Sequence, residues 1–255
     1  MADPVLLLWL EGPMQSWGTR SRWDVRDTGP EPTKSGVIGL IGCAMGLSRD
    51  DPALERLDRD LLFGVRVDRP GVFLTDYHTV TGYHRTAAGG FKRSGGTAKS
   101  LAKAQEHGES TIVSFRDYLH DAAFLVALAV KPEHRPGNRD LLGHLKERLQ
   151  NPKWPLYLGR KACVPSRPIF DRLTDEYQNL EHALHQVPWA APRSRKQRQA
   201  LESAIDAPKL QAWLECPHGD YERQDSIRLN QLRFYDFRRC RHIEIDTKVL
   251  SRRVP

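Results

Sequence analysis

Two short clusters hold the residues best suited to acid–base chemistry. They are Asp76-Tyr77-His78 and Tyr83-His84-Arg85. A metal-independent ribonuclease needs a base for the 2′-hydroxyl, an acid for the leaving oxygen and a cation for the phosphate. His78 or His84 could act with Tyr77, and Lys92 could supply the cation. Because 10 histidines in 255 residues also meet tyrosines by chance, we favour stacking or hydrogen bonding on RNA without chemistry.

Basic residues beside aromatic residues give better support for RNA contact. Arginine donates two hydrogen bonds to phosphate, and aromatic rings stack on unpaired bases. Three places combine the two types: Trp17 with Arg20, Phe91 with Lys92 and Arg93, and Tyr157 with Arg160 and Lys161. Any one of them is equally well explained as a solvated base beside a core aromatic. Three such places in one basic chain favour RNA binding.

The charge of the chain points to the same class of partner. The formal net charge is +7 and the isoelectric point is about 9.3, which favours polyanions such as nucleic acid. No apolar run is long enough to span a bilayer or act as a signal peptide, so we expect no membrane role. The four scattered cysteines predict reduced thiols in the cytoplasm and no zinc site. Phosphate-loop, dinucleotide and nucleophile-elbow motifs are absent, so no cofactor is expected.

The elements that must position these residues follow an α+β order. Apolar runs and capping residues predict strands at 5–10, 61–67, 72–80, 124–130 and 156–164, with helices capped by Ser35, Asp51 and Asn138. This order suits a ferredoxin-like sheet with helices on one face, the architecture of RNA-recognition modules. Alternation after residue 230 indicates a terminal hairpin, and residues 193–198 form a basic patch. We expect one domain over residues 1–255.

Two segments depart from this regular pattern. The first predicted helix contains Gly36, Gly39, Gly42 and Gly46, and each interior glycine costs roughly 1 kcal/mol relative to alanine. Close approach of a sheet explains this better than contact with a ligand, although both remain open. Residues 82–105 form a glycine-rich excursion with five basic and no acidic residues, which indicates a functional or disordered insertion.

Five stretches of the chain resemble one known family in the same order. They are LLLWLEGPMQSWG at 6–18, PTKSGVIGLIG at 32–42, DYHTV at 76–80, FRDYLHDA at 115–122 and YLGRKAC at 157–163. The sequence resembles the CasD family, a subunit of the type I-E CRISPR surveillance complex Cascade. The resemblance covers roughly residues 5–170 and fades after that.

The resemblance implies a modified ferredoxin-like, RNA-recognition-motif fold with an inserted β-hairpin thumb. The excursion lies where this thumb would be, at about 82–112, and a C-terminal extension would occupy about 170–255. Family members hold the 5′ handle of CRISPR RNA and contact the backbone subunit and the large subunit, with target DNA nearby. In type I-E systems a different subunit cuts the precursor RNA. We therefore expect a non-catalytic subunit; the alternatives are a metal-independent endoribonuclease and a duplex DNA binder.

The expected RNA-binding residues come from the first loop, the helix entry, the thumb and the motifs that carry the resemblance. The first loop and the helix entry leave the same edge of the first strand, so we expect their residues to line one face of the handle site. The residues are Gln15, Trp17, Arg20, Lys34, Ser35, Tyr77, His78, Arg85, Lys92, Arg93, Arg116, Arg160 and Lys161. Ser35 and the adjacent amides should attract phosphate at a helix N-terminus. Lys34 is expected to neutralise one phosphate.

Overall fold

A seven-stranded antiparallel sheet forms the centre of the computed structural model, which describes residues 3–19, 25–137, 140–190, 209–229 and 233–247. In spatial order the strands are β10 (Phe170–Thr174), β1 (Val5–Glu11), β9 (Ala123–Val130), β4 (Leu61–Arg69), β11 (Lys209–Glu215), β13 (Arg233–Asp246) and β12 (Tyr221–Leu229). β1 lies inside the sheet, and its continuous apolar run is buried along its whole length. Antiparallel pairing joins all neighbours.

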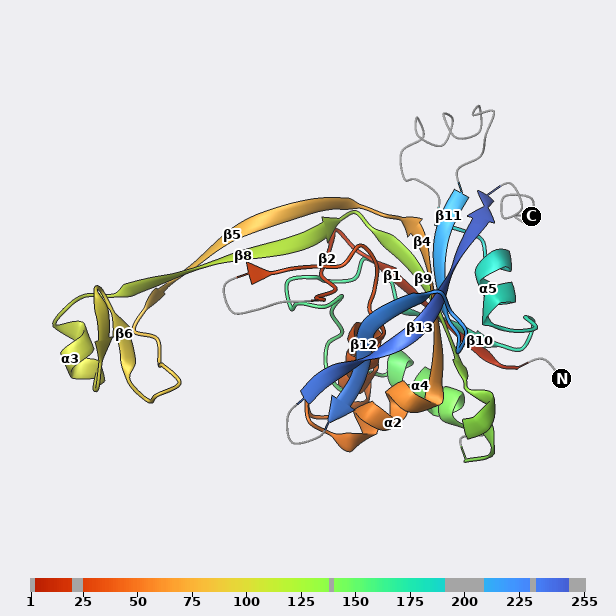
Figure 1. Cartoon of the computed structure of the whole chain (residues 1–255), viewed down its shortest axis with the longest axis horizontal. Coiled ribbons are helices and arrows are strands. Elements are labelled where there is room, and N and C mark those ends of the chain that lie inside the picture. Colours follow the sequence, from red (N-terminus) through yellow and green to blue (C-terminus); the bar gives the residue numbers. More distant parts are fainter. Residues whose placement is uncertain (1–2, 20–24, 138–139, 191–208, 230–232, 248–255) are drawn as a thin grey trace, which may run out of the picture.

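Three α-helices pack on one face of the sheet (Figure 1). They are α1 (Lys34–Met45), α2 (Pro52–Asp60) and α4 (Leu141–Gln150), and a 3₁₀ turn at Pro132–Gly137 precedes α4. Their apolar sides meet the inward residues of β1, β4 and β9 in the larger of two core clusters. This layer fixes where α1 begins, beside the first loop of the chain.

The opposite face of the sheet is also covered. The short helix α5 (Leu180–Gln186) packs on it in a second core cluster that includes Leu7 and Leu125. The buried guanidinium of Arg66 donates to the backbone oxygens of Leu184 and Val187 at the end of α5, and it pairs with Asp68. Both faces of the sheet therefore carry packed helices.

Local signals in the sequence explain the helix boundaries. The side chain of Thr33 caps α1 by accepting from Gly36 N, so the prediction of Ser35 as the cap was wrong by two residues. Asp51 caps α2 as predicted, with Pro52 as the first helical residue. Packing accounts for two of the helix glycines, since a Cβ at Gly42 would lie 2.5 Å from Leu54 and one at Gly36 would lie 2.9 Å from Trp17.

Two strand predictions need correction. Residues 156–164 form turns and loop instead of a strand, and β1 pairs with β9 on one side and with β10, at Phe170–Thr174, on the other. The terminal alternation belongs to a single long strand, β13, which pairs with β12 on one side and β11 on the other. The predicted cap Asn138 and the basic patch at 193–198 lie outside the described residues.

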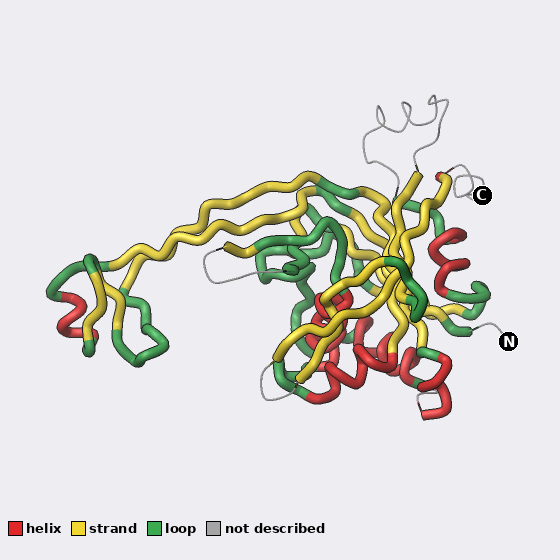
Figure 2. Tube along the Cα trace, in the orientation of Figure 1, coloured by secondary structure: helices red, strands yellow, loops and turns green. Residues whose placement is uncertain are grey.

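A long two-stranded arm projects from the body (Figures 1 and 2). It consists of β5 (Val72–Gly82) and β8 (Ser110–His120), and β8 also pairs with the short strands β2 (Met14–Gln15) and β3 (Val25–Arg26) near the body. The far end, here called the tip, carries β6 (Phe91–Arg93), β7 (Gly96–Ala98) and α3 (Leu101–Gln105). No helix in the described part of the chain is long and apolar enough to cross a membrane.

Candidate nucleic-acid interface

An open cleft of about 1040 Å³ lies where the first loop, the start of α1 and the β12–β13 hairpin meet. Its lining residues are Ser16, Trp17, Gly18, Thr19, Arg26, Thr33, Ser35, Gly36, Arg49, Gly159, Arg160, Gln224 and Tyr235. Three of these are arginines and none is acidic. The cleft, here called the arginine cleft, is therefore suited to a polyanion.

Two of the expected contact residues build the cleft from inside. Gln15 is fully buried and donates to the backbone oxygens of Leu10 and Ala122 at 3.0 and 2.9 Å. Its side-chain oxygen accepts from the Trp17 indole at 3.0 Å, and the Trp17 side chain is only 1% exposed. Gln15 and Trp17 therefore hold the first loop in place, and the indole does not offer an open face for stacking on a base.

Arg160 joins three segments at the edge of the cleft. Its guanidinium donates to the backbone oxygens of Asp117 at 2.9 Å and Arg26 at 2.7 Å, and it lies 4.7 Å from the Tyr118 ring. Gly159 allows this turn, because its φ is +98° and a Cβ would lie 1.8 Å from Ser16 O. The Gly159-Arg160 pair thus fixes the root of the arm to the cleft.

Four charged, amide or aromatic side chains of the cleft were not among the expected contacts. Arg26 comes from β3, Arg49 follows α1, and Gln224 and Tyr235 come from β12 and β13. Tyr235 is 37% exposed and gives the cleft an aromatic surface. Basic residues interleaved with aromatics around residue 235 were visible in the sequence, but nothing in the spacing brings that zone beside the first loop.

Lys34 lies in the interior, so the expectation that it neutralises a phosphate is wrong. Its side chain is 1% exposed, and its ammonium lies 2.8 Å from Glu215 and donates to Leu61 O at 2.8 Å. Lys131 also pairs with Glu215 at 2.8 Å. Burial lowers the pKa of Lys34, and the carboxylate of Glu215 opposes that shift. Lys34 ties α1 to the sheet, whereas Ser35, its neighbour, faces the arginine cleft.

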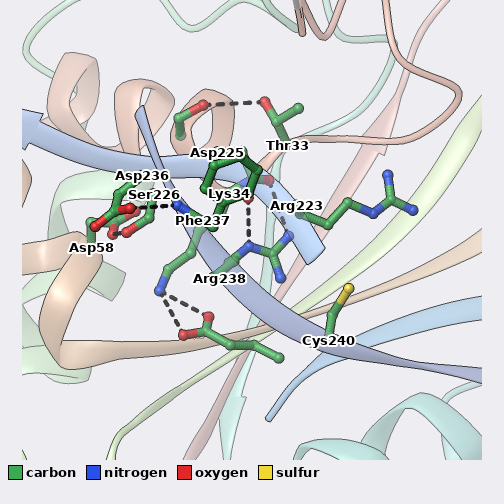
Figure 3. A network of polar contacts seen from close by, with 12 residues as sticks. Thr33, Lys34, Asp58, Arg223, Asp225, Ser226, Asp236, Phe237, Arg238 and Cys240 are labelled. Carbon is green, nitrogen blue, oxygen red and sulfur yellow. Dashed lines mark hydrogen bonds and ion pairs between the residues drawn. The ribbon is translucent and has the colours of Figure 1, made fainter. Parts of the chain in front are cut away.

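Buried polar contacts continue from Lys34 into the β12–β13 hairpin (Figure 3). The Lys34 amide donates to the Asp225 carboxylate at 2.8 Å, and Arg238 binds the same carboxylate at 2.6 and 3.0 Å. Ser226 donates to Asp58 on α2 at 2.5 Å. Burial raises the pKa of Asp58, and Lys34 opposes that shift. This network sets the position of the hairpin that carries Gln224 and Tyr235 relative to α1.

Six expected contact residues lie on the arm. Tyr77 is 61% exposed and packs edge-on against Phe115 at 5.6 Å, while Arg116 on β8 donates to Ser114 at 3.3 Å. The tip carries Arg85, Lys92 and Arg93, and the Arg85 guanidinium lies 5.4 Å from the Phe91 ring. His78 stands opposite Ser114. None of these six lines the arginine cleft.

The ribonuclease candidates do not converge. Tyr77 and His78 are neighbours on β5, so their side chains point to opposite faces of the arm. His84 lies beyond β5, and its ring bonds Val80 O at 3.1 Å. Among the described residues no contact joins any two of Tyr77, His78, His84 and Lys92 through their side chains. The geometry therefore brings no two of these four candidates together, and His78 instead lies 3.9 Å from the carboxylate of Asp76.

The remaining candidates add little to the site. Lys161 is exposed beside Arg160 but does not line the cleft, and Arg20 lies outside the described residues. Within the described ranges, no three histidine, cysteine, aspartate or glutamate side chains gather in a way that could hold a metal ion. All four cysteines are free thiols.

Comparison with known proteins identifies the family of this chain. The model of the CRISPR-associated protein (Cas_Cas5) family matches residues 5–237. The CRISPR system Cascade subunit CasD of Escherichia coli K12 is 36% identical over 174 residues, covering 65% of this chain and 69% of that protein.

Two solved structures share the fold over nearly the whole chain. A chain of a CRISPR RNA-guided surveillance complex superimposes with a TM-score of 0.68 at 32% identity, covering 96% of this chain and 92% of its own. A crystal structure of a Cas protein gives a TM-score of 0.62, also at 32% identity, covering 96% and 97%. The family resemblance in the sequence is thereby confirmed. The chain belongs to the Cas5 family of CRISPR-associated proteins, with the CasD subunits of type I-E Cascade among its relatives.

Proposed function

We propose that this chain is a non-catalytic RNA-binding subunit of a type I-E Cascade complex and that its arginine cleft holds the 5′ handle of the CRISPR RNA. The observation that carries the proposal is the lining of this cleft, which among the described residues has three arginines, Tyr235 and no acidic side chain. Arginines neutralise phosphates and an exposed aromatic ring stacks on an unpaired base. A single strand with splayed bases fits such a cleft.

The order of the strands and helices also supports an RNA-binding subunit. Four strands lie side by side in the order β10-β1-β9-β4. Along the chain, α1 and α2 connect β1 to β4, and α4 connects β9 to β10. We infer a modified ferredoxin-like fold from this order, extended by β11, β13 and β12. We assign the β5–β8 arm with its tip to the inserted thumb, and with this assignment the thumb begins at residue 72. Its exposed Tyr77, Phe73 and Phe115 and its basic tip are suited to contact with RNA and the backbone subunit.

Direct binding tests the handle assignment. The full chain should bind handle RNA more tightly than a scrambled RNA of equal length, and more tightly than duplex DNA at the same salt concentration. Arg26→Ala and Arg49→Ala should each lower the salt slope by about 0.7, the value for one phosphate of a single strand. Arg59→Ala is a matched control, because this exposed arginine on α2 does not line the cleft. Equal affinity for handle and scrambled RNA would refute the proposal.

Cleavage tests the enzymatic alternative. We expect no cutting of repeat RNA by the purified chain in EDTA, because the histidine and tyrosine candidates are separated on the arm. Cleavage that disappears in His78→Ala or His84→Ala would establish an endoribonuclease. Co-expression with the neighbouring CRISPR genes, followed by purification, should recover the chain with backbone and large subunits and an RNA of uniform length.

A further inference from the structure

A second cavity of about 520 Å³ lies beside the arginine cleft, and its size is ordinary for a small-ligand site. The two cavities share Thr19, Thr33 and Gln224 in their linings. The second cavity reaches from this shared edge toward the outer strands β11, β12 and β13, where Trp213, Glu222 and Phe237 line it. A strand that occupies the cleft would therefore have a side chamber within reach.

The two cavities differ sharply in charge. The second cavity is lined by four carboxylate residues and two arginines, namely Asp27, Glu31, Glu222, Asp225, Arg223 and Arg238. Both arginines pair with carboxylates of the same cavity, Arg223 with Glu31 and Arg238 with Asp225. A phosphate would meet a surplus of negative charge here, whereas the charged side chains among the described residues of the arginine cleft are all arginines. The second cavity instead suits a neutral group that donates hydrogen bonds.

The side chains at the mouth suit a flat ring. Phe237 is 58% exposed and stands directly opposite Gln224 across β12 and β13, on the face that also carries Glu222, whereas Arg223 lies on the other face, 4.3 Å from the Trp213 ring. Bases stack on phenylalanine rings. Gln224 donates to Tyr235 O at 3.2 Å, so its carbonyl oxygen is the part of the amide that can accept from a ligand. Glu222 adds an exposed carboxylate, 57% accessible, which pairs with Arg239 only at 3.7 Å.

We propose that this second cavity, the base pocket, receives one unstacked nucleobase of the bound RNA and selects a base that carries an exocyclic amino group over uracil. The inference rests on the proposed function, since the strand in the arginine cleft brings the base to the pocket. Carboxylate and amide oxygens accept from the amino groups of adenine, cytosine and guanine. Uracil has a carbonyl oxygen at the corresponding position, and this oxygen would face Glu222 and Gln224 without a donor between them.

A substitution scan of the RNA tests the base pocket. The probes are handle RNAs in which each base in turn is replaced by uracil or by an abasic site, and full-length protein is titrated at constant salt. Wild-type protein should show one position where either replacement weakens binding by about tenfold or more. In Phe237→Leu and Glu222→Gln this penalty should fall to threefold or less, while the penalties elsewhere and the salt slope stay unchanged.

Matched variants separate the pocket from its surroundings. Phe234→Leu removes an exposed aromatic of the same strand that lines neither cavity, and Arg239→Gln breaks the same ion pair as Glu222→Gln from outside the pocket. Both should keep the wild-type profile. An unchanged profile in Phe237→Leu and Glu222→Gln, with handle binding intact, refutes the base pocket alone. Failure of wild-type protein to prefer handle over scrambled RNA refutes the proposed function and the pocket together.

Discussion

Replacing Lys34 by alanine tests whether this lysine stabilises the protein interior or neutralises a phosphate of bound RNA. The substitution leaves Leu61 O without the ammonium that donates to it and removes the buried alkyl chain. It takes one of two cations from Glu215, since Lys131 stays 2.8 Å away. Breaking a buried ion pair costs about 3–5 kcal/mol, and the remaining lysine places this case near the lower value. A loss of about 3 kcal/mol lowers the melting temperature of a chain of this size by roughly 6–12 °C.

The measurement has two parts. Thermal unfolding of wild type and Lys34→Ala gives the change in stability, and Lys153→Ala serves as an exposed control. RNA titrations at several salt concentrations, below the melting temperature of the variant, give the salt slope. We expect a large loss of stability and an unchanged slope. A stability change below about 1 kcal/mol together with a slope lowered by about 0.7 would show that Lys34 neutralises a phosphate, and the interior assignment would be wrong.

The remaining predictions address the network, the turn at the arm and the tip. Burial raises the pKa of Asp58 in the folded state above its ordinary value of 3.8. The protonated Asp58 side chain therefore stabilises the fold below pH 3.8, and this stabilisation is lost as the pH rises through the raised pKa. In denaturant titrations at several pH values, Asp58→Asn should remove this part of the pH dependence. Gly159→Ala should lower the free energy of unfolding by about 1–3 kcal/mol, because the new Cβ would collide with Ser16 O. Gly39→Ala should raise it by up to about 1 kcal/mol, because nothing lies within 4 Å of the new Cβ and alanine favours the helix α1. Melting curves of the two variants test both predictions. Handle RNA should protect the tip from limited proteolysis, and a Gly-Ser linker in place of residues 84–104 should impair assembly into the complex. Equal cleavage with and without RNA, together with normal assembly, would contradict a role for the tip.

Local patterns in the sequence were sufficient for most elements of the body. The apolar run of β1 and the Asp51-Pro52 start of α2 depend on neighbouring residues alone, and both were correctly predicted. The prediction of a strand at 156–164 failed because its apolar residues reach the core from turns, as Leu158 and Cys163 do with no exposed surface. Periodicity cannot distinguish such buried loops from short strands.

The site was less predictable than the fold because its residues come from distant parts of the chain. Lys34 reads as a helix-entry cation in the sequence, yet its partner Glu215 is 181 residues away. Gln224 and Tyr235 are also far in sequence from the first loop, and they reach the cleft because β12 and β13 extend the sheet beyond β4. Of the expected contacts, Trp17, Ser35 and Arg160 line the cleft, and their contact with RNA stays a prediction.

The two halves of the arm also differ in how they are held. Its strands leave the body at a tight corner, where Gly71 has a φ of +73° and Asp121 a φ of +53°. Eleven paired residues then carry the tip outward, a length of about 37 Å at 3.4 Å per residue. β2, β3 and Arg160 hold β8 to the body at residues 115–120, so the first half of the arm has a third strand beside it. The five outer residue pairs, 78–82 with 110–114, form a two-stranded ribbon, and its twist and bend set the position of the tip relative to the body.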